Sequence, residues 1–241
     1  MTNDKMISPE PRPRTIGIVW VLYFVVAILG ALVTRGIVIR GDAPATASNI
    51  VASASLYRAG ISLDFAGNLL YIALIALLYW LFRPVDRRVA LLATLFGVVG
   101  ATVQIVAELL RLAPQVLLTD PQVSGAFSAQ QLQAAVMFSL RLYARSFEFS
   151  FVLFALFELA IAYLILRSKF LPRAIGVLWV LAGLSWPLFL WPPLAAAVQP
   201  VIIAIGGAAE ISLALWLIIK GVDEVRWRQW TEVSPPNAIS Q

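Results

Sequence analysis

The sequence predicts an all-α protein, a polytopic membrane helix bundle with about six transmembrane helices. Of its 241 residues, 61% are hydrophobic and 13% are charged, whereas soluble domains carry about 25% charged residues. The mean hydropathy is +0.86. The chain also contains several apolar stretches near the roughly 20 residues that a helix needs to cross a hydrocarbon core of about 30 Å. Most of the chain is therefore expected to be solvated by lipid.

Six spans are expected, with helical extensions on the outer side of the membrane. They cover residues 16–39, 56–82, 89–113, 145–166, 174–191 and 198–219. This division predicts a tail over residues 1–15, a six-helix transmembrane domain over residues 16–220 and a second tail over residues 221–241.

The basic residues predict the orientation of the bundle. Of the 18 Lys and Arg residues, 12 lie in the tails or in the second and fourth connections, whereas the connections 41–55, 114–129 and 192–199 contain none. Basic segments stay on the cytoplasmic side, so both termini are expected there, as an even number of spans requires. We attribute the net charge of +5 to this signal and expect no nucleic-acid binding. The 12 residues are Lys5, Arg12, Arg14, Arg83, Arg87, Arg88, Arg167, Lys169, Arg173, Lys220, Arg226 and Arg228.

Two segments predict helices on the outer side. Residues 130–166 are expected to form one helix of 37 residues, about 55 Å long at 1.5 Å per residue. Because this exceeds the thickness of the hydrocarbon core, its first turns are expected to extend beyond the bilayer. Asp42 followed by Pro44 is typical of a helix start, which predicts a short polar helix over residues 44–55.

Tryptophans mark two further features. Trp186, followed by a proline, is expected to kink the fifth span, and Trp191, followed by two prolines, is expected to end it, with both rings at the outer interface. Residues 223–230 are predicted to lie on the inner membrane surface through Trp227 and Trp230.

The sequence contains no Cys and no His. Disulfides, thiol catalysis and iron–sulfur ligation are therefore excluded. The commonest ligand of zinc, haem iron and copper is missing, and so is the usual general base. No Gly-rich phosphate loop and no nucleophile elbow occurs. We assign no catalytic residue, no metal ligand and no cofactor.

Charged and polar side chains recur at helical spacing on three spans, in the outer half of the membrane. They are Asp64, Asn68 and Tyr71 with Arg58 on the second span, Gln104, Glu108 and Arg111 on the third, and Arg141, Arg145 and Glu148 on the fourth. A charge that faces lipid costs at least about 2.5–3.5 kcal/mol, so these residues are expected to face the bundle interior. They form either a closed salt-bridge network or an outward-open pocket for a small polar or anionic ligand, such as a lipid head group. Arg111, Arg141 and Arg145 could instead reach water at the interface.

Two further carboxylates lie deeper. Glu158 is on the fourth span, and Glu210 follows Gly206 and Gly207 on the sixth. A lone deep carboxyl group can be neutral and hydrogen-bonded to a neighbouring helix, which is the interpretation we favour. The alternative is a proton-coupling site. The glycine pair is more typical of close helix packing.

Four pieces of the chain resemble one known family. They are residues 41–47 with Tyr57, Arg58 and Asp64, then residues 83–85, then residues 170–173 with Ile175 and Gly176, and finally residues 210–216 with Lys220 and Gly221. In this order, over about residues 16–222, they resemble the bacterial membrane proteins of domain-of-unknown-function family 4386. The resemblance implies a six-span protein of the bacterial cytoplasmic membrane and no established activity. The positions that it marks as family features are Asp42, Arg58, Asp64, Pro84, Pro172, Gly176, Glu210 and Gly221.

Three functions follow as hypotheses. The first is binding or transport of a small polar or anionic ligand, such as a lipid head group, in the outer-half pocket. The second is a structural or accessory subunit that packs against a membrane-protein partner. The third is an intramembrane enzyme that uses carboxylates. The lipid bilayer is the expected partner in all three.

Overall fold

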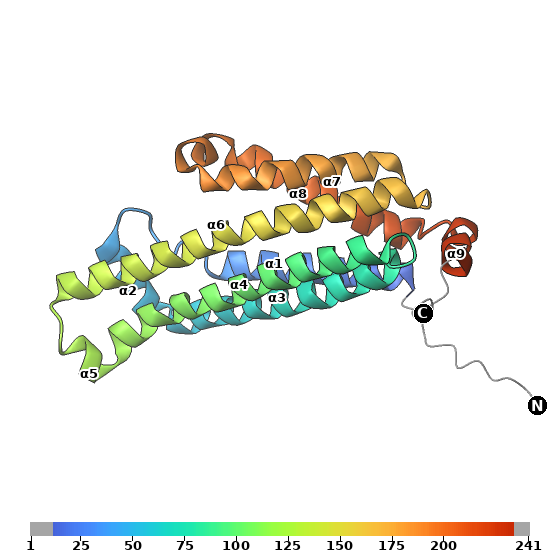
Figure 1. Ribbon diagram of the computed structural model, residues 1–241. Coiled ribbons are helices and arrows are strands. Elements are labelled where there is room, and N and C mark those ends of the chain that lie inside the picture. Colours follow the sequence, from blue (N-terminus) through green and yellow to red (C-terminus); the bar gives the residue numbers. More distant parts are fainter. Residues whose placement is uncertain (1–11, 234–241) are drawn as a thin grey trace, which may run out of the picture.

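The structure is a bundle of long helices (Figure 1). The computed structural model describes residues 12–233, in which no β-strand occurs. The elements are α1 (Pro13–Val33), α2 (Ala43–Ala52), α3 (Ala54–Phe82), α4 (Arg87–Thr119), α5 (Pro121–Ser124), α6 (Ala129–Ser168), α7 (Arg173–Ser185), the 3-10 helix η1 (Trp186–Leu190), α8 (Pro192–Ile219) and α9 (Glu224–Val233). Six segments of the described chain are long and apolar enough to cross a membrane: α1, α3, α4, α6, α7 with η1, and α8. The predicted all-α fold with six spans is confirmed.

The six long helices form a ring in chain order. Each packs on the next, from α1 to α3, α4, α6, α7 and α8, and α8 packs back on α1. The ring closes where α1 and α8 approach at Gly17, since an added Cβ there would lie 2.7 Å from the backbone oxygen of Ala214. One face of every long helix is therefore turned toward a shared centre.

Aromatic side chains fill the centre of the ring. Trp20 of α1 meets Trp179 of α7 edge to face, with ring centroids 5.7 Å apart. Tyr71 of α3 meets Phe154 of α6 in the same way at 5.4 Å. Edge-to-face pairs stabilise a core beyond the area that they bury. This aromatic layer joins opposite sides of the ring.

Some helices are much longer than a membrane is thick. α4 has 33 residues and α6 has 40, which makes them about 50 and 60 Å long. Together with α2 and α5 they form an extension at one end of the bundle, here called the α2 end, opposite the α9 end (Figure 1). The extension has a hydrophobic core of its own, made of Ile37, Ile50, Tyr57, Ile61, Val136 and Leu140. The single long helix expected over residues 130–166 is confirmed, whereas its place outside the bilayer stays a prediction.

The connection expected at residues 114–129 begins instead inside a helix. Pro114 lies within α4, which continues to Thr119. Proline lacks the N–H that would bond to the carbonyl of Leu110, four residues earlier. The hydroxyl of Ser139 on α6 donates to that carbonyl instead. Proline is tolerated in a membrane helix where a neighbouring helix satisfies the freed carbonyl in this way.

Replacing Ser139 by alanine is expected to lower the free energy of unfolding by about 1–3 kcal/mol, because the carbonyl of Leu110 loses its donor. In a Pro114→Ala background the cost should be smaller, since residue 114 then supplies an N–H. Denaturation of the four purified proteins in detergent measures this coupling. An equal cost of Ser139→Ala in both backgrounds would contradict the assignment.

The helix start at Asp42 is confirmed. The Asp42 carboxylate accepts a hydrogen bond from the backbone N–H of Ala45 at 2.8 Å, and α2 follows.

The fifth span departs from α-helical geometry where expected, because α7 ends before Trp186 and the 3-10 helix η1 follows. Trp191 is exposed, as predicted, whereas Trp186 packs inward on Phe151 with ring centroids 4.6 Å apart. The sixth span begins at residue 192, earlier than residue 198, since prolines are well accommodated in the first turn of a helix.

The C-terminal segment packs on the bundle. The indole N–H of Trp230 donates to the carbonyl of Ser168 at 2.9 Å, and that of Trp227 donates to the carbonyl of Leu81 at 3.4 Å. These carbonyls belong to the last turns of α6 and α3, which lack partners within their own helices. Trp227 and Trp230, through which residues 223–230 are expected to lie on the inner membrane surface, thus bond to helix ends, and contact with that surface stays a prediction. Lys5 and the outer parts of both predicted tails lie outside the described residues.

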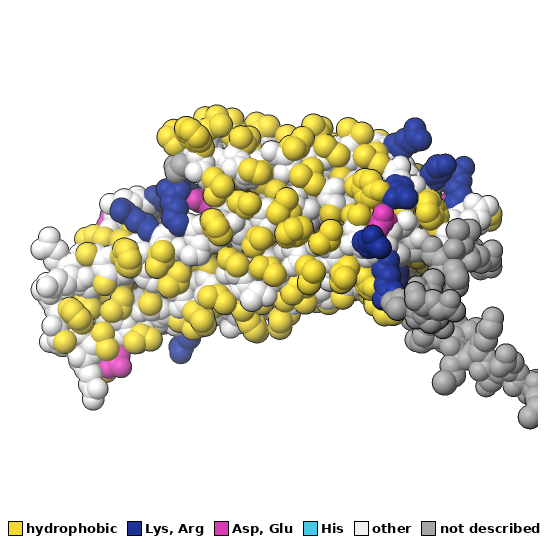
Figure 2. All heavy atoms as spheres, in the orientation of Figure 1, with side chains coloured by type: hydrophobic (Ala, Val, Ile, Leu, Met, Phe, Trp, Pro, Cys, Tyr) yellow, Lys and Arg dark blue, Asp and Glu magenta, His cyan; other side chains and the backbone are white. Residues whose placement is uncertain are grey.

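The distribution of hydrophobic and basic side chains over the surface is the one expected of a protein that crosses a membrane. Figure 2 shows hydrophobic side chains over the middle of the molecule, Lys and Arg gathered at the α9 end, and a second basic group toward the α2 end. Arg167 at the α9 end pairs with Asp86 at 3.0 Å. The cytoplasmic location of this end stays a prediction.

Candidate functional site

A buried ion cluster joins α3 and α4 inside the bundle. The guanidinium of Arg111 donates to the Glu108 carboxylate at 3.0 Å and also to the carboxylate of Asp64. The side chains of Arg111 and Glu108 are 9% and 4% exposed, and that of Asp64 is 26% exposed. Three of the residues predicted from the charged stripes thus meet in one place, which we call the Arg111 cluster.

Four helices position this cluster. Gly30 of α1 lies against Asp64, and an added Cβ there would be 2.7 Å from its Oδ1 atom. The rings of Tyr57 on α3 and Tyr143 on α6 flank the guanidinium, with centroids 5.8 and 5.1 Å from its central carbon. Aromatic rings at such distances attract a cation. The hydroxyl group of Tyr57 also donates a hydrogen bond to the backbone carbonyl of Arg111 at 2.9 Å.

The charges of the Arg111 cluster do not balance. Two carboxylates share one guanidinium, which leaves one negative charge in excess when both are ionised. The Oε1 atom of Glu108 is buried and makes no hydrogen bond of ordinary geometry, although the hydroxyl of Tyr143 lies beside this carboxylate. A buried acceptor without a partner costs about 1–3 kcal/mol, and native proteins contain few of them. The cluster thus has both the charge and the free acceptor to receive a hydrogen-bond donor.

Two more of the predicted residues lie one helical turn from the Arg111 cluster and extend its polar lining into the bundle. Asn68, one turn from Asp64, is 8% exposed and donates to the carbonyl of Asp64 at 3.0 Å. Gln104, one turn from Glu108, donates to the hydroxyl of Ser150 on α6 at 3.0 Å. Both side chains face the interior of the bundle, as the stripes predict.

The other predicted residues do not join this cluster. Arg58 and Arg141 are exposed, and Arg145, which is 60% exposed, pairs with Glu148 on its own helix at 2.8 Å. An exposed pair of this kind contributes little stability. Their exposure agrees with the interpretation that long basic side chains reach water near the interface.

The two deep carboxylates lie together at the centre of the ring. Glu210 on α8 accepts hydrogen bonds from Tyr71 at 3.1 Å and from Trp20 at 3.4 Å. Glu158 on α6 is 2% exposed and interacts electrostatically with Glu210. We call these two residues the Glu158–Glu210 pair. The sequence indicates two separate carboxylates and gives no polar signal for Trp20, which lies in an apolar span.

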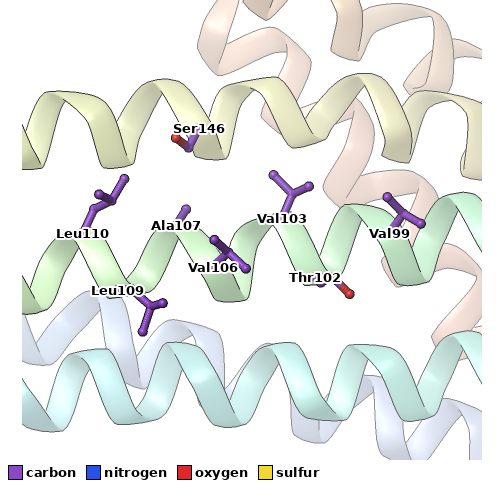
Figure 3. Close-up of a pocket in the computed structure, with 8 residues that line it drawn as sticks. All are labelled: Val99, Thr102, Val103, Val106, Ala107, Leu109, Leu110 and Ser146. Atoms are coloured by element: carbon purple, nitrogen blue, oxygen red, sulfur yellow. The ribbon is translucent and has the colours of Figure 1, made fainter.

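The surface of the described residues includes the following two grooves. One, of about 480 Å³, runs between α4 and α6 and is lined by Val99, Thr102, Val103, Val106, Ala107, Leu109, Leu110 and Ser146 (Figure 3). Its lining is apolar and contains none of the predicted site residues. Another, of about 300 Å³, is lined by Gly41, Ala43, Ala134, Met137, Phe138 and Arg141. Among the described residues, no group of three or more Asp or Glu side chains is placed to hold a metal ion.

Several family positions have structural roles. Asp42 caps α2, and Gly221 has a φ of +70°, a left-handed conformation that favours glycine. Gly176 lets α7 approach α6 closely, since an added Cβ would lie 2.7 Å from the Leu166 side chain. Asp64 and Glu210, in contrast, belong to the two buried polar clusters.

The fold and its buried charges define a multi-pass membrane protein, a six-helix bundle with polar clusters inside. Residues 15–221 match the family model described as a domain of unknown function (DUF4386), so the chain belongs to this family. The resemblance seen in the sequence is confirmed. No curated protein and no solved structure matches the chain.

Proposed function

We propose that the protein binds a small polar ligand at the Arg111 cluster, and that this ligand carries a positively charged donor group such as an ammonium. The observation that supports the proposal is the Oε1 atom of Glu108, a buried acceptor that makes no hydrogen bond of ordinary geometry even though the Tyr143 hydroxyl lies beside the carboxylate. An ammonium donates several hydrogen bonds and adds the positive charge that the cluster lacks. Asp64, a quarter of which remains exposed, offers the approach to it.

An anionic ligand fits this cluster less well. The guanidinium of Arg111 already donates to both carboxylates, so an anion would have to displace one of them. The arginines at positions 58, 141 and 145 are exposed and lie outside the cluster. An added negative charge beside Asp64 and Glu108 would also be repelled.

The position of the cluster supports entry from the α2 end. Arg111 lies about 36 Å along α4 from its first residue, Arg87. A hydrocarbon core of about 30 Å that starts at the α9 end would place the cluster near the opposite membrane surface. If the basic α9 end faces the cytoplasm, the ligand arrives from the outer side of the bacterial cytoplasmic membrane. Neither a role as accessory subunit nor a carboxylate-based reaction has a comparable observation in its favour.

Thermal unfolding of the purified protein tests this proposal. The compounds are ethanolamine, choline, putrescine and spermidine, with phosphate and glycerol phosphate as anions. At least one amine is expected to raise the midpoint of unfolding, because a ligand at 100 times its Kd stabilises by about 2.7 kcal/mol. Glu108→Gln, which keeps the shape but removes the charge, should lose this stabilisation.

Arg145→Ala is the matched control, since it removes an exposed charge on a neighbouring helix, and it should keep the response to amines. Stabilisation by the anions alone would favour the anionic ligand instead. An equal response of Glu108→Gln and the wild type would place the binding elsewhere. A lack of response to every compound would support a closed salt-bridge network.

A further inference from the structure

The Glu158–Glu210 pair is a second polar centre, separate from the Arg111 cluster. Its two carboxylates come from α6 and α8, the helices that flank α7 in the ring. Glu210 has two hydrogen-bond donors, whereas the Oε2 atom of Glu158 is buried and has no partner. The indole N–H of Trp186 lies beside this carboxylate without the geometry of a hydrogen bond, and it too is buried without a partner. A carboxylate oxygen and an N–H thus both remain unsatisfied at the same point.

No basic side chain compensates the pair. In the described part of the chain, the ion pairs involve neither Glu158 nor Glu210. Two ionised carboxylates close together in an apolar bundle would repel each other strongly, so the pair needs a positive charge between or beside them.

The surrounding groups favour a proton as that charge. Tyr71, Trp20 and Trp186 turn O–H and N–H groups toward the carboxylates. Such donors stabilise an oxygen that carries a partial negative charge. The indole N–H groups offer no lone pair to a metal cation, and the Tyr71 hydroxyl already donates to Glu210. A proton bound by one of the two carboxyl groups needs no further ligands.

We propose that the Glu158–Glu210 pair is a proton-binding site that exchanges its proton with water. On binding, one carboxylate oxygen forms an O–H bond and the charge of the pair changes from −2 to −1. On release, that bond breaks and the proton leaves to water. The inference does not depend on the ligand proposed for the Arg111 cluster.

A polar connection leads from the pair toward the Arg111 cluster. Tyr71 bonds to Glu210, and its ring lies 5.0 Å from that of Tyr23 on α1. Tyr23 interacts electrostatically with both Glu210 and Asp64, so it lies between the two centres. The α3 face that carries Tyr71 continues through Asn68 to Asp64. We expect a proton to approach along these side chains, from the α2 end.

The titratable groups around the pair are few. Tyr23 on α1 and Tyr71 on α3 face it, and each of α6 and α8 contributes one carboxyl group. α7 packs there with Trp179, and η1 with Trp186, which do not titrate. α4 approaches with Gly97 and Gly100. A proton that titrates in this layer is therefore assigned to the two carboxyl groups.

A structural role would look different. Two carboxyl groups that are permanently neutral or permanently hydrogen-bonded would hold α6 and α8 in place and would not exchange protons with water. Infrared spectroscopy separates the two cases, because a protonated carboxyl group has a C=O stretch that a carboxylate lacks. The experiment records this band for the full-length protein in lipid vesicles as the pH is varied and H₂O is replaced by D₂O.

The wild type is expected to show a carboxyl band that shifts in D₂O and disappears reversibly as the pH rises. Glu158→Gln and Glu210→Gln should each remove or displace that band, whereas Glu148→Gln, at the exposed pair, should leave it unchanged. If neither variant folds, Trp186→Phe keeps both carboxyl groups and should displace the band. A band that neither shifts in D₂O nor titrates, or one that both glutamine variants retain, would overturn the proposal. Such a failure leaves the ligand site untouched, since Glu108 is not altered.

Discussion

Replacing Arg111 by methionine is expected to lower the free energy of unfolding by about 3–5 kcal/mol, since it leaves two buried carboxylates without their counter-charge. Glu108 is 4% exposed and cannot turn to water, and Asp64 is held against Gly30. Methionine keeps an unbranched apolar stem in place of the arginine stem, so the lost stability comes mainly from the lost charge and its hydrogen bonds. Denaturation of the purified protein in mixed micelles measures the change.

Two comparisons isolate the cause. Arg145→Met removes an arginine from an exposed pair on the surface of α6 and should cost no more than about 1 kcal/mol. Adding Asp64→Asn and Glu108→Gln to Arg111→Met should restore most of the stability, because neutral amides remain where unpaired charges stood. If Arg111→Met and Arg145→Met cost the same, the Arg111 cluster does not hold α3 and α4 together as described.

Hydropathy was sufficient to predict the spans. Each of the six helices overlaps its predicted range, because lipid requires every backbone N–H and C=O to be satisfied within the segment. The end of α3 at Phe82 was predicted to the residue, where a basic connection follows the apolar run. Local signals predicted the start of α2 equally well, since a capping aspartate acts within a few residues.

The helix ends that depend on a neighbour were not predictable in this way. Pro114 is a helix breaker by local rules, and only the hydroxyl of Ser139 on another helix makes its place inside α4 possible. Trp230 is similar, because its partner carbonyl at the end of α6 lies far away in the sequence. A single sequence does not state which distant residue supplies a hydrogen bond.

The charged stripes predicted the site in part. On α3 and α4, the helical spacing placed Asp64, Glu108 and Arg111 on faces that do meet. On α6 the same spacing included Arg141 and Arg145, which the structure leaves exposed. A charge that faces lipid is costly only along the part of a helix that lies within the hydrocarbon core. α6 is about 60 Å long, so part of it is expected to lie outside that core. The deep pair was not predictable from either helix alone, since α7 separates α6 from α8 in the ring and only the closed bundle brings the two carboxylates near each other.

The central claim is that small cations can reach the Arg111 cluster from the α2 end. The chain contains no Cys, so a single introduced cysteine is the only thiol that can react with the reagents. Asn68→Cys places a thiol one turn from Asp64 on the interior face of α3, and Ala126→Cys, between α5 and α6, is the exposed control. Both are treated with methanethiosulfonate reagents of similar size that carry either a quaternary ammonium or a sulfonate.

Relative to the control, the cysteine at position 68 is expected to react faster with the ammonium reagent than with the sulfonate, because the cluster carries an excess of negative charge. An amine that stabilises the wild type should slow this reaction. A faster reaction with the sulfonate would show an anion site instead, and no reaction with either reagent would show a closed salt-bridge network; either result contradicts the account.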